Sequence, residues 1–182
     1  KEAERMGYSY YTGPEMEFFL FKGKPGEISP EPQDRASYFD VSTDLATDLR
    51  RQMSMTLEEL GIKVETHHHE RGFGQQEIDF HYDSAKHTAD NVVTLRLAVK
   101  AVAQANGLYA TFMPKPIWGM AGSGMHVHQS LIDIQSGRNQ FYDGDDHYGL
   151  SEIAKKFIAG QLYHAPGMCA VLSPLVNSYK RL

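Results

Sequence analysis

Residues 13–22 read Gly-Pro-Glu-Met-Glu-Phe-Phe-Leu-Phe-Lys, and this stretch decides the fold. Side chains alternate between the two faces of a β-strand, so Glu15 and Glu17 share one face with Phe19 and Phe21. Both faces become apolar within a few residues, which is typical of a strand buried in a sheet. The strand therefore begins with two carboxylates on one face. Taken alone, this pair favours a strand end that protrudes into solvent.

Outward from this stretch, periodicity predicts further strands and three helices. The predicted strands are residues 8–12, joined to 15–22 around Gly13-Pro14, and then 62–70, 75–82, 108–113 and 125–131. The predicted helices are residues 43–60, 84–106 and 151–163, the last with Ser151 as its N-cap. Residues 23–36 hold three prolines and two glycines and are expected to form a surface loop. Hairpins combined with crossing helices indicate an α+β fold with a mainly antiparallel sheet and flanking helices.

Apolar residues at helical spacing define the helix faces that we expect in the core. In the first long helix they are Leu45, Leu49, Met53, Leu57 and Leu60. In the second they are Ala89, Val92, Val93, Leu97, Val99 and Val102.

Composition excludes several classes of protein. Acidic residues outnumber basic ones 23 to 18, and no basic run offers a nucleic-acid surface. No apolar segment reaches the roughly 18 residues that a membrane span needs, and residues 1–6 are not a signal peptide. A lone cysteine, Cys169, fits a reducing compartment, so we expect a soluble cytoplasmic protein. The start without methionine and the abrupt end lead us to expect a piece of a longer protein.

Acidic side chains recur on the second hairpin. Glu70 ends its first strand, and on the next strand Glu77 shares a face with Asp79 and His81. The alternation is that of a half-buried strand, and a solvated outer face explains it equally well.

A third element, residues 122–131, has the same form. His126, His128 and Ser130 lie on one face of the predicted strand, after two closely spaced glycines. A single histidine is most often a core or surface residue, but two in register with a serine are less easily explained in that way.

If these faces meet in one cavity, the carboxylates need neutralisation. Two carboxylates about 4 Å apart repel by roughly 4 kcal/mol at an effective dielectric constant of about 20. Glutamate oxygens with few histidines favour Mg²⁺ or Mn²⁺ over Zn²⁺. Because alternate strand residues are about 6.5–7 Å apart, Glu15 and Glu17 suit two neighbouring ions better than one. Such a paired-metal site suits phosphoryl transfer.

The run His67-His68-His69 does not form a metal site in this interpretation. Strand alternation sends His68 to one face and His67 and His69 to the other. We therefore expect a strand-end role and assign these histidines no catalytic function.

Five blocks of sequence together resemble prokaryotic-type (type I) glutamine synthetase. They cover essentially the whole chain, in the order in which they occur in that family. The blocks are Gly13-Pro-Glu-Met-Glu-Phe-Phe-Leu-Phe21, His68-His-Glu70 with Gly74-Gln-Gln-Glu-Ile-Asp-Phe80, Met113-Pro-Lys-Pro116, Gly122-Ser-Gly-Met-His-Val-His-Gln-Ser-Leu131 and Asn177-Ser-Tyr-Lys-Arg-Leu182.

This resemblance implies a ligase that makes glutamine from glutamate, ammonia and ATP through γ-glutamyl phosphate. It also implies Mg²⁺ or Mn²⁺ at two or more sites and a ring-like homo-oligomer, a dodecamer. Carried over by motif, the metal ligands are Glu17, Glu70 and Glu77 for one ion and Glu15 and His126 for the other. The implied substrate-binding residues are Gly122 and Arg181, the latter also catalytic, and the implied ATP-binding residues are Tyr82, His128 and Ser130.

The chain also departs from the family pattern. Ala121 stands where asparagine is often found, which removes a side-chain hydrogen bond and bears on substrate affinity. A further metal-ligand glutamate, phosphate-binding arginines and a glutamate-bearing flap would follow Arg181, and an N-terminal domain would precede Lys1. We therefore expect residues 1–182 to be part of the catalytic domain and to be inactive or nearly so alone.

Three other functions compete with this one. A ligase of the same superfamily that joins glutamate to an amine or polyamine would share the metal and phosphate apparatus. A catalytically silent structural homologue has no chemical reason to retain the five predicted metal ligands. A metal-dependent phosphohydrolase lacks a separate nucleophile or base signature.

Overall fold

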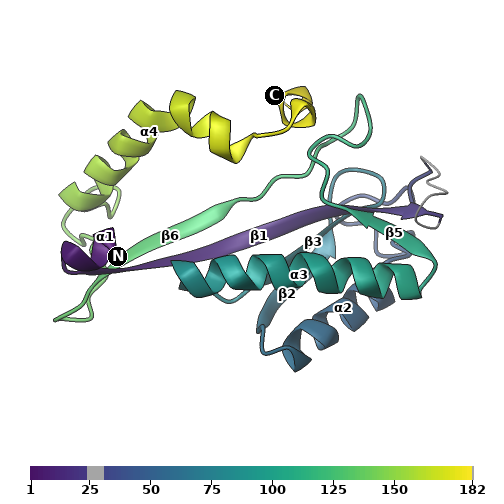
Figure 1. Ribbon diagram of the computed structural model, residues 1–182, viewed down its shortest axis with the longest axis horizontal. Helices are drawn as coiled ribbons and strands as arrows, with labels where there is room; N and C mark the ends of the chain where they lie inside the picture. The colour runs from purple at the N-terminus through teal and green to yellow at the C-terminus, as the bar shows by residue number, and fades with distance from the viewer. Residues whose placement is uncertain (24–30, 182) are drawn as a thin grey trace.

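The computed structural model of this chain describes residues 1–23 and 31–181, and one long strand organises it (Figure 1). This strand, β1 (Tyr8–Lys22), pairs antiparallel with four others. Its first half pairs with β6 (Val127–Asp133) and β4 (Asp83–Ser84), and its second half with β3 (Gln75–Phe80) and β5 (Leu108–Thr111). β2 (Val64–His69) lies on the outer side of β3. The predicted α+β fold with an antiparallel sheet is confirmed.

The prediction of two strands around Gly13-Pro14 is wrong, because β1 runs through both residues. Gly13 pairs with His128 and Pro14 with Val127 of β6, so the neighbouring strand keeps the backbone extended. The proline, which has no N–H to donate, lies where β1 changes partners, and the next ladder begins at Glu15.

Two helices, α2 (Thr47–Glu59) and α3 (Ala85–Ala105), cover the same face of the sheet (Figure 1). Met16, Phe18 and Leu20 of β1 point to this side and are buried against the helices. The carboxylates of β1 consequently point to the opposite face. The helices supply the remaining core together with strands β3 and β5, through Leu49, Met53, Leu57, Ile78, Phe80, Leu95, Val99, Val102 and Ala110.

Several predicted helix details are wrong. Helix α2 begins at Thr47 rather than residue 43, because the Asp44 carboxylate accepts a hydrogen bond from Ala46 N in a preceding turn. Leu45 in that turn is exposed and does not enter the core. On α3, Val93 and Leu97 are 68% and 71% exposed, because this helix has apolar residues on more than one face. Ala89 and Leu60, which we also expected in the core, are exposed as well. Val92 packs against the core, as expected.

The C-terminal part lies across the other side of the sheet. Helix α4 (Glu152–Leu172) lies on the side of the sheet opposite α2 and α3 and leads to the short 3₁₀-helix η1 (Val176–Lys180) (Figure 1). As predicted, the Ser151 hydroxyl caps α4 by accepting a hydrogen bond from Ala154 N, at 3.1 Å. The helix runs nine residues beyond the predicted end at 163 and continues through Pro166. The first element is a four-residue helix, α1 (Glu2–Arg5).

The predicted loop 23–36 falls partly outside the described residues, which omit 24–30. In its described part Asp34 is buried and accepts hydrogen bonds from Leu45 N and His69 Nε2, so these residues are not a simple surface loop. Within the described residues, no helix is both long enough and apolar enough to cross a membrane.

Candidate active site

Strand register brings the acidic residues to one face of the sheet. Glu15 lies opposite Asp79, and Glu17 lies opposite Glu77. On the outer strand, His68 lies opposite Glu77. Residues directly opposite in antiparallel strands project to the same side. Three strands therefore contribute to a single polar cluster.

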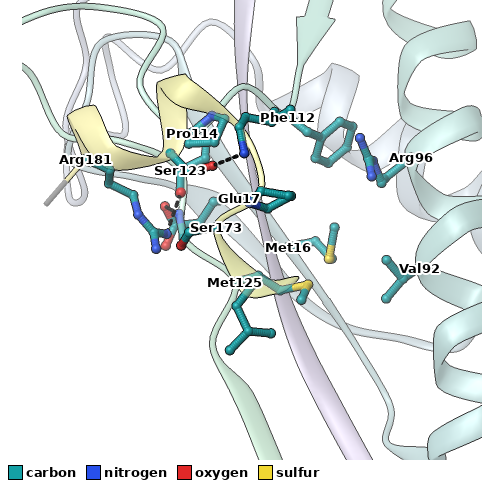
Figure 2. Close-up of a pocket in the computed structure, with 15 residues that line it drawn as sticks. Met16, Glu17, Val92, Arg96, Phe112, Pro114, Ser123, Met125, Ser173 and Arg181 are labelled. Atoms are coloured by element: carbon teal, nitrogen blue, oxygen red, sulfur yellow. Dashed lines mark hydrogen bonds between the residues drawn. The ribbon is translucent and has the colours of Figure 1, made fainter. Parts of the chain in front are cut away.

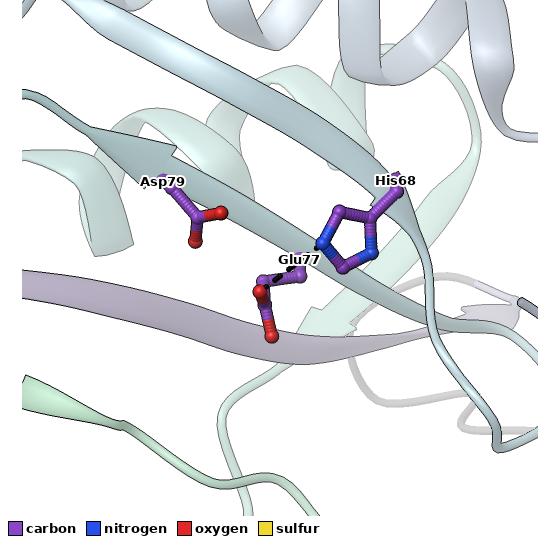
Figure 3. A group of neighbouring side chains, drawn as sticks. All are labelled: His68, Glu77 and Asp79. Atoms are coloured by element: carbon purple, nitrogen blue, oxygen red, sulfur yellow. Dashed lines mark ion pairs between the residues drawn. The ribbon is translucent and has the colours of Figure 1, made fainter.

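Contacts within this cluster centre on His68. Its Nε2 lies 3.2 Å from a Glu77 carboxylate oxygen, and its Nδ1 lies 3.5 Å from one of Glu70. One ligand atom from each of His68, Glu77 and Asp79 lies within 4.8 Å of the others (Figure 3). This spacing suits side chains that share a cation.

Several carboxylates of the cluster have raised pKa values, because they are buried close to one another. Burial, followed by the nearby Asp79 carboxylate, raises the pKa of Glu77 to about 8. Burial and then the Glu15 charge raise the pKa of Asp79 to about 6. The pKa of Glu17 is also raised, first by burial, although a hydrogen bond from Gly124 N opposes the effect. These carboxylates need a proton or a cation to be stable together.

The donor set fits a hard divalent cation. Asp79 Oδ1 is buried and has no hydrogen-bond partner among the described residues, so an acceptor oxygen is available for a ligand. Carboxylate oxygens with few imidazole nitrogens are the ligands that Mg²⁺ and Mn²⁺ prefer. Of the three predicted ligands of the first ion, Glu77 belongs to this group with His68 and Asp79. Glu70 and Glu17 lie close enough for their charges to raise the pKa of Glu77 further. Their assignment as metal ligands stays a prediction.

Glu15 forms a second group with two histidines. His126 Nδ1 lies 2.9 Å and His128 Nε2 lies 2.5 Å from its two carboxylate oxygens. The hydrogen bond from His128, and next that from His126, lower the pKa of Glu15 although its partial burial raises it. An ionised Glu15 beside His126 is the arrangement that the predicted second metal position requires.

Glu17 joins the strand cluster to the loop 113–124. One of its carboxylate oxygens accepts hydrogen bonds from Gln75 Nε2, at 2.6 Å, and from Gly124 N, at 2.9 Å. A Cβ at residue 124 would lie 3.0 Å from the other oxygen, so glycine permits this approach. Gln75 also donates to Gly122 O at 3.2 Å, which fixes the glycine loop against the strand.

The predicted substrate residues Gly122 and Arg181 lie close together beside Glu17. Arg181 Nη1 donates a hydrogen bond to Ser123 O at 3.0 Å, and a Cβ at residue 122 would lie 3.1 Å from Arg181 Cγ. A pocket of about 300 Å³ opens here (Figure 2). Glu17, Ser123 and Arg181 lie at one end of it, and the other end is lined by Met16, Val92 and Phe112 together with the charged side chain of Arg96.

The three predicted nucleotide residues line one other pocket. Tyr82, His128 and Ser130 surround a cavity of about 500 Å³ at the β1–β6 ladder. Gly13 lies against Tyr82, since a Cβ there would be 3.2 Å from Tyr82 Cβ. A smaller pocket of about 180 Å³, lined by Glu15, Asp79, Tyr82 and His128, connects this region to the acidic cluster. The nucleotide assignment itself remains a prediction.

Three residues of the site have no role in the sequence-based prediction. His68 is the histidine of the run that faces Glu77, on the side that strand alternation predicts, although the sequence alone assigns it no function. Alternation also puts Asp79 on the face of Glu77 but assigns it no role. Gln75 carries the same signal, because it precedes Glu77 by two residues and so shares its face.

Comparison with known proteins relates this chain to a described family. Residues 1–182 match the family described as "Glutamine synthetase, catalytic domain". The chain belongs to the glutamine synthetase family. The resemblance found in its five sequence blocks is thereby confirmed.

Relatives within the glutamine synthetase family match along the whole chain. Glutamine synthetase of Clostridium saccharobutylicum is 52% identical over 183 residues, which cover 100% of this chain and 41% of that protein. Glutamine synthetase of Halobacterium salinarum is 52% identical over 182 residues, 99% of this chain and 40% of that protein. A solved GmaS/ADP complex is 36% identical with a TM-score of 0.87, covering 100% of this chain and 42% of that one. The chain thus spans about two fifths of the length of these relatives.

Proposed function

We propose that this chain is part of the catalytic domain of a ligase that joins ammonia to the γ-carboxyl of glutamate at the expense of ATP. The observation that carries the proposal is the acidic cluster of Glu15, Glu17, Glu70, Glu77 and Asp79. It lies between the pocket of Arg181 and the pocket of Tyr82. Two anionic reactants meeting at such a cluster need cations, and the donor set suits them.

Two groups of side chains would hold the metal ions. Glu17, Glu70 and Glu77 would hold one ion, and Glu15 with His126 would contribute to the other. Mg²⁺ or Mn²⁺ bound there would neutralise phosphate oxygens during phosphoryl transfer. Asp79 and His68 lie within reach of the first group.

The remaining residues bind and orient the reactants. Arg181 uses one N–H on Ser123 O, and its other donors have no partner among residues 1–23 and 31–181, so they can bind a substrate carboxylate in a fixed fork. Gly122 lets the loop approach that side chain. Tyr82, His128 and Ser130 line the pocket for ATP, the aromatic ring being available to stack on adenine.

The chemistry then has two steps. A γ-carboxylate oxygen of glutamate attacks the γ-phosphorus of ATP, the bond to ADP breaks, and γ-glutamyl phosphate forms. Ammonia attacks the activated acyl carbon, phosphate leaves with the bonding electrons, and the nitrogen loses a proton. Positioning and charge neutralisation supply most of the rate enhancement in the first step.

An assay of the full-length protein tests the proposal, since this chain spans about two fifths of its relatives. Product formation from glutamate, ATP and Mg²⁺ is measured with ammonia and, separately, with amines and polyamines. Preference for an amine would replace the proposal by the amine ligase, and no turnover with any acceptor would favour a silent homologue. Glu17→Ala is expected to abolish turnover through loss of a metal ligand, and near-normal turnover would reject that role.

The family resemblance extends the proposal to assembly and location. We propose a ring-like homo-oligomer, a dodecamer, in the cytoplasm. Native mass spectrometry of the full-length protein gives the subunit number, and a monomer would contradict the ring.

A further inference from the structure

The side chain of Ser123 has an unusual position. The residue is only 7% exposed, and its hydroxyl oxygen is buried with no hydrogen-bond partner among the described residues. A buried hydroxyl without a partner is destabilising, because it has given up its hydrogen bonds to water and gained none in return. Because buried polar groups are nearly always paired, this one calls for a functional explanation.

Both main-chain groups of Ser123 are fully used, which holds the residue in place. Its N–H donates to Pro114 O at 2.9 Å, and its carbonyl accepts from Arg181 Nη1 at 3.0 Å. The same loop is fixed a second time by Asn177, whose side chain accepts from Lys115 N at 2.7 Å and donates to Lys115 O at 3.0 Å. The hydroxyl is therefore held in position by a rigid loop.

Ser123 lies at the Glu17 and Arg181 end of the 300 Å³ pocket, between groups of opposite charge (Figure 2). A Cβ at the next residue, Gly124, would be 3.0 Å from a Glu17 oxygen and 3.9 Å from Arg181 Nη1. Among residues 121–124, Ser123 is the one with a polar side chain. An α-amino acid carries both an ammonium and a carboxylate, and a hydroxyl can accept from the first or donate to the second.

We infer that the Ser123 hydroxyl is a binding group for the amino-acid end of glutamate, an inference that rests on the proposed function. The hydrogen bond forms with the α-ammonium or α-carboxylate, which remain unchanged through the reaction. The interaction is accordingly the same in the ground state and the transition state. Its loss raises KM and leaves kcat nearly unchanged.

The test compares Ser123→Ala with Thr88→Val in the full-length protein. Thr88 is also buried, but it lines none of the three pockets described above, and its hydroxyl donates a hydrogen bond to Thr12 O at 3.0 Å. For Ser123→Ala we expect KM for glutamate to rise about tenfold, kcat to stay within about twofold, and Tm without glutamate to stay equal or rise. For Thr88→Val, which removes a satisfied buried hydrogen bond away from the pocket, we expect a lower Tm and an unchanged KM.

Thermal unfolding with added L-glutamate gives a readout independent of turnover. The increase in Tm that glutamate produces should shrink in Ser123→Ala and persist in Thr88→Val. An unchanged KM in Ser123→Ala, or a Tm that falls as in Thr88→Val, would overturn the inference. Failure of the proposed function is seen separately, as absence of turnover by the unaltered protein while glutamate still raises its Tm.

Discussion

Replacing Glu77 by glutamine should stabilise the protein when divalent cations are removed. Glu77 is buried, and its pKa is raised from 4.5 to about 8 by burial and by neighbouring carboxylates, Asp79 first. At pH 7 the unfolded carboxyl has lost its proton while the folded one retains it, which costs about 3 kcal/mol in unfolding free energy. Glutamine has the same shape and no such cost.

The sign of the pH dependence follows from the raised pKa. A carboxyl with a raised folded pKa leaves stability intact below pH 4.5, and that stability is lost as the pH rises towards about 8. The advantage of Glu77→Gln should therefore be small at pH 5 and grow to about 3 kcal/mol at pH 7. Urea unfolding in EDTA at pH 5, 6, 7 and 8 measures it.

The matched control for this experiment is Glu65→Gln. Glu65 lies on the adjacent strand β2, but its side chain is about half exposed, so the change should alter unfolding free energy by no more than about 0.5 kcal/mol. Saturating Mn²⁺ should reverse the ranking, because the unaltered protein gains more from the ion. A Glu77→Gln variant that is less stable than the unaltered protein in EDTA at every pH would refute this account of the acidic cluster.

Three further predictions concern other parts of the molecule. Asp44→Asn should lower the unfolding free energy by about 3–5 kcal/mol in urea titrations, since the buried Arg50 guanidinium, 2.6 Å from the Asp44 carboxylate, would lose its ionic partner. Gly124→Ala should weaken Mn²⁺ binding at least about tenfold by calorimetry, because the new Cβ would press against Glu17; unchanged affinity would show that the contact is unimportant. Tyr82→Ala should weaken ATP binding by roughly 1–3 kcal/mol in a fluorescent-nucleotide competition, and equal affinity would move the adenine elsewhere.

Strand alternation correctly predicted which side chains share one face of a strand, but not which side chains lie next to one another across strands. It placed Glu15 and Glu17 on one face, and the structure confirms that face as the one opposite the helices. Alternation could not show that Asp79 lies opposite Glu15, because register depends on how distant strands align. Nor could alternation show a role for His68, since its partner Glu77 lies on another strand.

Helix faces and strand ends were predicted less well, for physical reasons. Helix α3 carries apolar residues on several faces, so spacing alone could not separate the buried Leu95 from the exposed Leu97. A glycine–proline pair usually ends a strand, but at Gly13-Pro14 pairing with β6 outweighs the local preference. Both errors come from contacts with elements far away in sequence.

Because β1 is one continuous strand, an error in its register would affect the core and the site together. A slip of one residue against its partners would turn Glu15 and Glu17 towards the helices and bring Met16 and Phe18 out among the histidines. Such a misaligned chain would bury unpaired carboxylates and expose apolar side chains at the same time, so the misaligned state would be unstable. Correct assembly of the hydrophobic interior and correct placement of the reactive groups are thus a single event.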